Sequence, residues 1–167
     1  KKIFKGFCKQ KKHEIILKRI EIIDNLDKFL SQKKNFLSKF FKRKKKLCFY
    51  LYGKVGVGKT MLLNFVFERL KIRKHRQHFN EFMINFHNFR HEKKDNNTIT
   101  AFVKELKKRY DLIYLDEFQV TNIVDAMILG KLFEVIFEEK IKIIITTNTQ
   151  LHELYKDGLQ RDQFSPF

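Results

Sequence analysis

Long apolar runs, cysteine pairs and internal repeats are all lacking from this sequence. No apolar stretch approaches the roughly 18 residues that a membrane-spanning helix needs, so the sequence predicts no segment that crosses a bilayer. The two cysteines, Cys8 and Cys48, lie far apart and form no C-x-x-C pair, which favours a reducing compartment over a disulfide-linked domain. The H-E-x-x-H pattern of zinc proteases is also missing. We therefore interpret four histidines as surface or core residues rather than zinc ligands: His75, His78, His87 and His91.

Acidic residues are scarce relative to basic ones, and the imbalance is local. The 167-residue chain carries 36 Lys and Arg against 19 Asp and Glu, a net charge of +17. Residues 1–46 hold 17 of the basic and 4 of the acidic residues, a net of +13. That segment suits either an arm that binds nucleic acid, ribosome or anionic lipid, or a solvated lysine-rich surface, and we favour the surface. The chain is long and apolar enough for one packed core.

Glycine is rare as well, and three of the six glycines fall within one motif. Residues 53–60 are Gly-Lys-Val-Gly-Val-Gly-Lys-Thr and fit the Walker A pattern G-x-x-x-x-G-K-[ST]. A strand is predicted before the motif and a helix after it. In that arrangement the backbone N–H groups of the loop converge on a phosphate at the helix N-terminus. The Lys59 ammonium can then reach the β- and γ-phosphates. We therefore predict an ATP site formed by Gly53, Lys54, Val55, Gly56, Val57, Gly58, Lys59, Thr60 and Met61.

Two further strand ends carry polar groups suited to phosphate hydrolysis. Residues 112–117, Leu-Ile-Tyr-Leu-Asp-Glu, form an apolar strand that ends in two carboxylates, a Walker B pattern. Ligands of open α/β sheets bind at the carboxyl ends of strands. We therefore predict that Thr60 and Asp116 hold Mg²⁺ and that Glu117 accepts a proton from, or orients, the attacking water. Asn148 follows the last predicted strand, where its amide can hydrogen-bond the γ-phosphate and that water.

Strands and helices alternate along the chain from residue 47 onward. Strands are predicted at 47–52, 76–79, 111–116 and 142–147, and helices at 59–71, 81–92, 98–109 (capped by Thr98) and 123–139. This alternation predicts an α/β fold with a parallel sheet covered on both faces. A further amphipathic helix is predicted at 13–31, with its apolar face packed on the core. We expect two parts, a basic N-terminal helix and linker at 1–46 and a nucleotide-binding core at 47–167.

Four stretches carry a resemblance to a known family: residues 51–61, residues 76–83 with His87, residues 115–121 with 125–129, and residues 153–161. On these stretches the chain resembles the AFG-one-like ATPases, the AAA+ family of bacterial ZapE and the eukaryotic lactation-elevated protein. The resemblance implies ATP hydrolysis by a P-loop NTPase with a three-layer sandwich and the strand order 1-4-3-2. It also implies a fifth strand and a helical lid beyond Phe167.

The resemblance further implies roles for two polar residues. Asn148 matches the sensor 1 position, and Arg161 lies where AAA+ proteins carry an arginine finger that reaches the γ-phosphate of a neighbouring subunit in a ring. An alternative for Arg161 is a structural pair with Asp157 or Asp162.

Partners and location are likewise implied by the resemblance rather than by composition. Family members associate with the cell-division machinery in bacteria and serve protein quality control at the mitochondrial inner membrane in eukaryotes. We therefore expect protein clients, association with the inner membrane and a mitochondrial location, and we expect a segment before Lys1. The competing hypothesis is an ATP switch that binds nucleic acid or ribosome through the basic segment.

Overall fold

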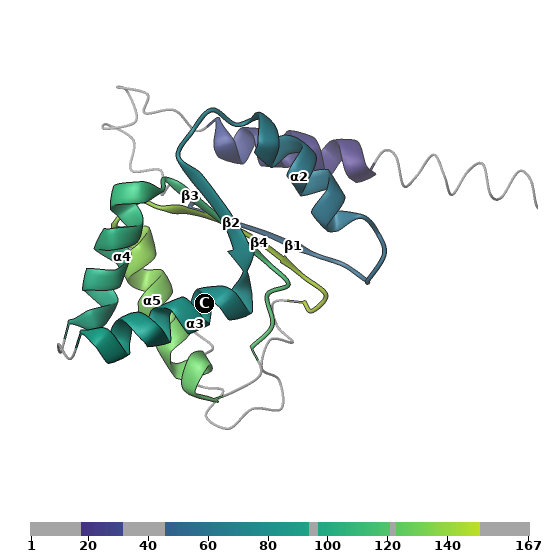
Figure 1. The fold of residues 1–167 in the computed structure, drawn as a ribbon. Coiled ribbons are helices and arrows are strands. Elements are labelled where there is room, and N and C mark those ends of the chain that lie inside the picture. Colours follow the sequence, from purple (N-terminus) through teal and green to yellow (C-terminus); the bar gives the residue numbers. More distant parts are fainter. Residues whose placement is uncertain (1–17, 32–45, 94–96, 121–122, 151–167) are drawn as a thin grey trace, which may run out of the picture.

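Four parallel strands form one sheet in the computed structural model, which describes residues 18–31, 46–93, 97–120 and 123–150. The strands are β1 (Cys48–Tyr52), β2 (Lys74–His78), β3 (Leu112–Asp116) and β4 (Lys142–Thr147). Their order across the sheet is β1-β4-β3-β2, and each neighbouring pair is parallel (Figure 1). This order confirms the prediction.

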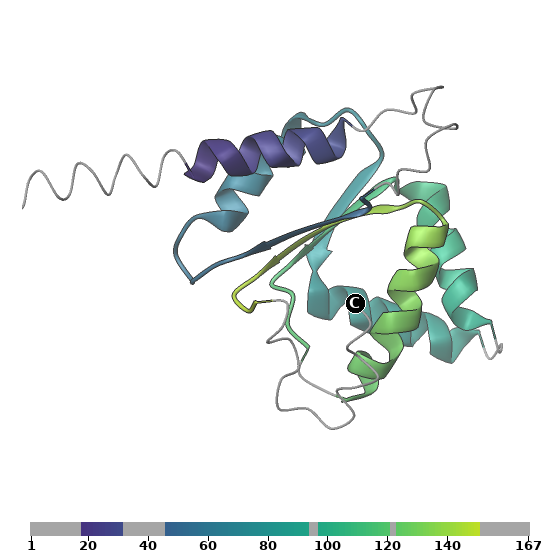
Figure 2. The same cartoon turned by 180° about the vertical axis from the view of Figure 1, so that it is seen from behind.

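Helices cover both faces of the sheet. They are α2 (Lys59–Arg69), α3 (Phe79–Glu92), α4 (Thr98–Arg109), α5 (Ile123–Glu138) and a helix over residues 18–30. Figures 1 and 2 show α2 and the helix 18–30 on one face, and α3, α4 and α5 on the other. The predicted three-layer α/β architecture is therefore confirmed.

Strand β3, one of the two inner strands, is buried on both sides because its side chains alternate between two apolar clusters. Ile113 and Leu115 pack with the three-helix layer. Leu112 and Tyr114 pack with α2 and the helix 18–30. A strand that is buried on both faces needs an uninterrupted apolar run, which is the pattern that predicted it.

The helix 18–30 is part of the core, although it belongs to the basic end of the sequence. Leu26 and Phe29 are buried with Leu63 and Tyr114. The Lys142 ammonium donates to the carbonyls of Phe29 and Leu30, both at 2.9 Å, and so caps the end of this helix. The prediction that its apolar face packs on the core is confirmed for the described residues. Across those same residues, no helix is both long and apolar enough to cross a membrane.

The predicted start of β2 was wrong because that strand is polar. It was predicted at 76–79 but begins at Lys74, whose ammonium donates to carbonyls at the end of α2, Glu68 and Leu70 at 2.9 Å among them. Phe79 instead begins α3 and is buried. Thr98 was likewise misplaced by one position, since Asn97 occupies the cap of α4.

Candidate functional site

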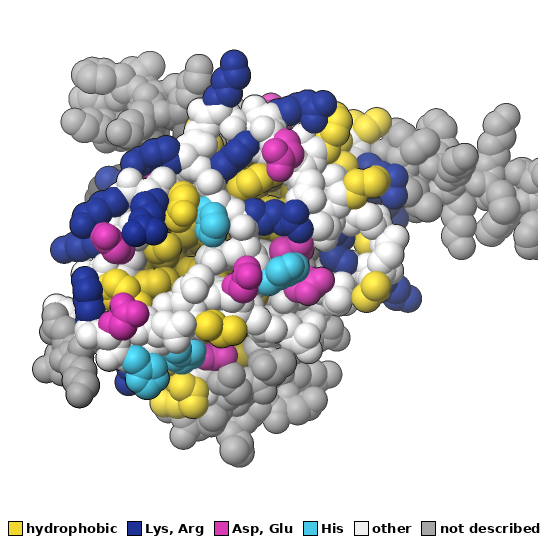
Figure 3. Space-filling view, viewed as in Figure 1, with side chains coloured by type: hydrophobic (Ala, Val, Ile, Leu, Met, Phe, Trp, Pro, Cys, Tyr) yellow, Lys and Arg dark blue, Asp and Glu magenta, His cyan; other side chains and the backbone are white. Residues whose placement is uncertain are grey.

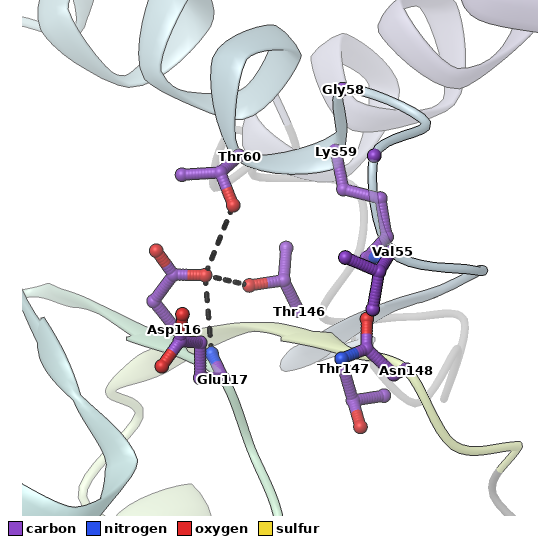
Figure 4. A pocket seen from close by; sticks show the side chains of 10 residues that line it. Val55, Gly58, Lys59, Thr60, Asp116, Glu117, Thr146, Thr147 and Asn148 are labelled. Carbon is purple, nitrogen blue, oxygen red and sulfur yellow. Dashed lines mark hydrogen bonds between the residues drawn. The ribbon is translucent and has the colours of Figure 1, made fainter.

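A cleft opens where three parallel strands end. β1 runs into the glycine loop, β3 ends at Asp116 and β4 ends at Thr147, so these strand ends lie at one edge of the sheet. The cleft has a volume of about 310 Å³. Figure 4 shows the residues that line it, which are Val55, Gly56, Gly58, Lys59, Thr60, Asp116, Glu117, Thr146, Thr147 and Asn148.

The glycine loop joins β1 to α2 in a conformation that requires glycine. Gly56 and Gly58 have φ of 80° and 81°, in the left-handed region that side chains with a Cβ disfavour. Gly58 occupies the N-cap of α2, and its carbonyl accepts from Leu62 N–H at 3.0 Å. Gly53 N–H donates to the Thr147 carbonyl at 3.2 Å and ties the loop to β4. The loop therefore presents a helix N-terminus to the cleft, which suits a phosphate.

The Lys59 ammonium connects the loop to the end of β4. It donates to the carbonyls of Gly53 at 2.5 Å and Lys54 at 2.9 Å. It also donates to Asn148 Oδ1 at 2.9 Å. A cation beside a helix N-terminus and a side-chain amide is a donor set that fits the oxygens of a polyphosphate.

Asp116 is a buried carboxylate that faces the first turn of α2. Its Oδ1 accepts from Thr60 Oγ1 at 3.3 Å, from the Thr146 hydroxyl and from Glu117 N–H at 3.1 Å (Figure 4). Burial alone would raise the pKa of Asp116, but hydrogen bonds from Thr146 and Arg76 outweigh it and hold that pKa below its ordinary value. The carboxylate is therefore ionised at neutral pH. Together with the Thr60 hydroxyl it offers the oxygen ligands that Mg²⁺ takes beside phosphates.

Glu117 and Asn148 follow the ends of β3 and β4. Glu117 has a φ of 54°, which turns the chain sharply, and its side chain is 77% exposed, with Oε2 lying 3.6 Å from His78 Nδ1. The turn that carries Asn148 is held from two sides. Thr147 Oγ1 donates to the Phe118 carbonyl at 2.6 Å, and the Tyr50 hydroxyl donates to the carbonyl of residue 149 at 2.8 Å.

Most of the predicted site residues meet in this cleft. Of the others, Gly53 and Lys54 contact Lys59 through their carbonyls. The Val57 carbonyl accepts from Arg19 Nη2 at 3.3 Å, and Met61 is exposed on α2. Arg161, with its alternative partners Asp157 and Asp162, lies outside the described residues.

Among the residues that contact Asp116, Thr146 and Arg76 were not predicted as site residues. Thr146 is a buried hydroxyl that directly follows the three isoleucines of β4, and a polar residue at the end of such an apolar run is a usable signal. Arg76 stands in the polar strand β2, and its Nη2 lies 2.5 Å from Asp116 Oδ2. Nothing in the spacing of Arg76 indicates this contact, because it depends on β2 lying beside β3.

Comparisons with known proteins give one consistent result. The family model described as AFG1-like ATPase matches residues 8–167. Lactation elevated protein 1 homolog B of Danio rerio is 40% identical over 132 residues, which cover 71% of this chain and 26% of that protein. Cell division protein ZapE of Escherichia coli strain K12 is 36% identical over 119 residues, which cover 70% of this chain and 32% of that protein.

A solved structure supports the same fold. The crystal structure of DnaI has a TM-score of 0.56 and 20% sequence identity, and the match covers 87% of this chain and 73% of that one. The chain itself spans 26% to 32% of the length of the curated relatives that it matches.

Proposed function

The chain belongs to the AFG1-like ATPase family of AAA+ proteins, and from this premise we propose that it binds ATP with Mg²⁺ in the cleft and hydrolyses it to ADP and phosphate. One observation carries the proposal. A glycine loop with a lysine, a buried carboxylate with a facing threonine, and an asparagine lie around a single cleft of about 310 Å³. Each of these groups suits a different part of a metal–nucleotide complex.

In this mechanism the chain binds the phosphates through backbone N–H groups and the Lys59 ammonium. Thr60 and Asp116 would hold Mg²⁺, which when bound neutralises phosphate charge. Glu117 is exposed and directly follows Asp116 at the end of β3, so it can accept a proton from the attacking water. Asn148, already hydrogen-bonded to Lys59, would orient that water against the γ-phosphate.

Two substitutions in the full-length protein test this mechanism. Lys59→Ala is expected to abolish ATP binding because it removes the lysine of the loop that lines the cleft. Glu117→Gln is expected to bind ATP without turnover, because the amide cannot accept the proton. Binding is measured with a fluorescent ATP analogue and hydrolysis by phosphate release.

Matched controls carry the same changes outside the cleft, at Lys108 and Glu105, which pair with each other on the surface of α4. Both control variants should bind and hydrolyse ATP like the wild type. Full phosphate release by Glu117→Gln would contradict the mechanism.

For assembly, we propose that Arg161 completes the site of a neighbouring subunit in a ring, as the family resemblance implies. A guanidinium stabilises negative charge spread over phosphate oxygens. The ATPase rate per subunit should then rise with protein concentration, and Arg161→Ala should remove that rise. A rate that is independent of concentration would favour the structural pair with Asp157 or Asp162.

For clients and location, we propose that ATP turnover remodels or hands over protein clients in mitochondria, at the inner membrane. The support for these proposals is the family resemblance, which includes a eukaryotic relative from Danio rerio.

A second candidate, an ATP switch that binds nucleic acid or ribosome, is favoured by the net charge of +13 in residues 1–46. On the face drawn in Figure 3, Lys and Arg also gather over the end of α4 and the start of β2, but Asp111 and Glu105 pair with Arg73, Lys107 and Lys108 there. The discriminating experiment is a salt titration of RNA and DNA binding. It should replace the basic run 42–46 by glutamine rather than delete residues 1–46, because the helix 18–30 is part of the core.

A further inference from the structure

Arg76 contacts Asp116, one of the residues that line the cleft, from the edge strand β2. It lies on β2, directly opposite Tyr114 in the parallel register. Its guanidinium carbon lies 5.3 Å from the centre of the Tyr114 ring, and its Nη2 lies 2.5 Å from Asp116 Oδ2. The contact is an ion pair between a 34% exposed arginine and a 4% exposed carboxylate.

The two oxygens of Asp116 have different kinds of partner. Oδ1 accepts from neutral donors, namely the hydroxyls of Thr60, Thr146 and Tyr114 and the backbone N–H of Glu117. Oδ2 accepts from the Arg76 guanidinium. The orientation of the carboxylate is therefore supported several times over by neutral groups, whereas its charge is balanced by Arg76.

The cleft has a second cation, but it is engaged elsewhere. Lys59 donates to Gly53, Lys54 and Asn148. Among the residues whose contacts the structure describes, Arg76 is thus the cation paired with Asp116. A buried carboxylate without a cation is strongly unfavourable, so this pairing keeps Asp116 both buried and ionised.

We propose that Arg76 acts through Asp116, as a fixed countercation for this Mg²⁺-binding carboxylate. It stabilises the carboxylate before a divalent cation arrives, and it weakens the attraction of that carboxylate for Mg²⁺ so that the metal–nucleotide complex can be exchanged. The inference rests on the proposed function of the cleft. Its physical basis is that the Arg76 guanidinium and Mg²⁺ are both positive and would lie beside the same carboxylate, so each repels the other.

The test compares Arg76→Gln with Arg73→Gln in the full-length protein. Arg73 forms the matched pair at the other end of the same two strands, with Nε 2.9 Å from Asp111 Oδ2, on the surface and away from the cleft. One readout is the Mg²⁺ concentration that gives half-maximal binding of a fluorescent ATP analogue. The other is the melting temperature in EDTA and with Mg²⁺ alone.

Arg76→Gln is expected to need about three- to tenfold less Mg²⁺ than the wild type, because the competing charge is gone. In EDTA it should melt at a lower temperature than the wild type, and Mg²⁺ alone should raise its melting temperature by more than it raises that of the wild type. Arg76→Lys, which keeps the charge, should return the Mg²⁺ requirement toward the wild-type value. Arg73→Gln should leave the Mg²⁺ dependence of both readouts unchanged.

An unchanged Mg²⁺ requirement in Arg76→Gln would overturn the proposal and leave a purely structural role. An increased requirement would overturn it too, because Arg76 would then serve to orient the carboxylate. If Arg76→Gln does not fold, the melting temperature of the double variant Arg76→Gln/Asp116→Asn tests the pairing. Once the carboxylate charge is gone, Arg76 has no charge to balance, so the double variant should be no less stable than Asp116→Asn. Wild-type protein that binds no nucleotide would contradict the proposed function instead, and the melting temperatures would still test the pairing.

Discussion

Gly56 and Gly58 share a left-handed backbone, but their surroundings differ. A Cβ on Gly56 would meet no atom within 4 Å, whereas one on Gly58 would lie 3.4 Å from Arg19 Nη2 and 3.8 Å from Met61 Cε. The neighbour is the tip of a flexible arginine and can move. Backbone strain, rather than crowding, therefore makes glycine necessary at both positions.

We expect Gly56→Ala and Gly58→Ala each to lower the free energy of unfolding by about 1–2 kcal/mol, the cost of a left-handed alanine. Urea denaturation measures this loss. Gly53→Ala is the control, because Gly53 lies outside the left-handed region and its Cβ would make ordinary contacts, the nearest at 3.4 Å from Val57. An equal loss at Gly53 would show that crowding in the loop, and not φ, is responsible.

At the scale of elements, the Asp111 carboxylate stabilises the turn between α4 and β3 through hydrogen bonds. Asp111 accepts from Arg73, the residue before β2, and from Lys107 in the last turn of α4, and its N–H donates to the Arg73 carbonyl at 2.8 Å. Hydrogen bonds from Arg73 and Lys107 lower the pKa of Asp111 to about 2. The turn thus joins three elements at the edge of the sheet opposite the cleft.

A lowered pKa predicts stability that is present above about pH 4 and is lost as the pH falls toward 2. Because the Asp111 side chain is 40% exposed, solvent screening limits the effect, and Asp111→Asn should cost less than about 1 kcal/mol at pH 7. Urea denaturation of both proteins between pH 7 and pH 2 measures it. If the free energies of unfolding of the wild type and Asp111→Asn still differ at pH 2, the charge of the carboxylate is not the source of the difference.

At the scale of the whole molecule, the helix 18–30 closes the layer that also holds the glycine loop. Leu26 and Phe29 fill the space over β3 and β4, and Arg19 donates to the Val57 carbonyl at 3.3 Å. The division at residue 46 remains a prediction, but the described part of the basic segment shares a core with the sheet that carries the cleft.

Leu26→Ala should therefore lower the free energy of unfolding by about 2–4 kcal/mol, because a fully buried leucine leaves a cavity. Ile20→Ala on the same helix is the matched control. Ile20 is 50% exposed, so its loss should stay within about 0.5 kcal/mol. Similar small losses in both variants, measured by urea denaturation, would show that the helix adds little to the core.

The sequence by itself determined the features that depend on neighbours along the chain. The Walker A loop follows from residues 53–60, and the buried strand that ends at Asp116 follows from one apolar run. Strand order could be predicted only through the family resemblance, since periodicity shows which face a residue takes but not which strand lies beside it. The start of β2 was missed because the Lys74 ammonium satisfies carbonyls at the end of α2, a contact that no local pattern indicates.

Only the tertiary structure decided what surrounds the site residues. Arg76 and Asp116 are 40 residues apart, and Thr146 is 30 from Asp116. They meet because β2, β3 and β4 are adjacent and parallel, with their ends at one edge of the sheet. A buried carboxylate takes its charge balance and its hydrogen bonds from whichever strands lie beside it, and that adjacency is a property of the fold.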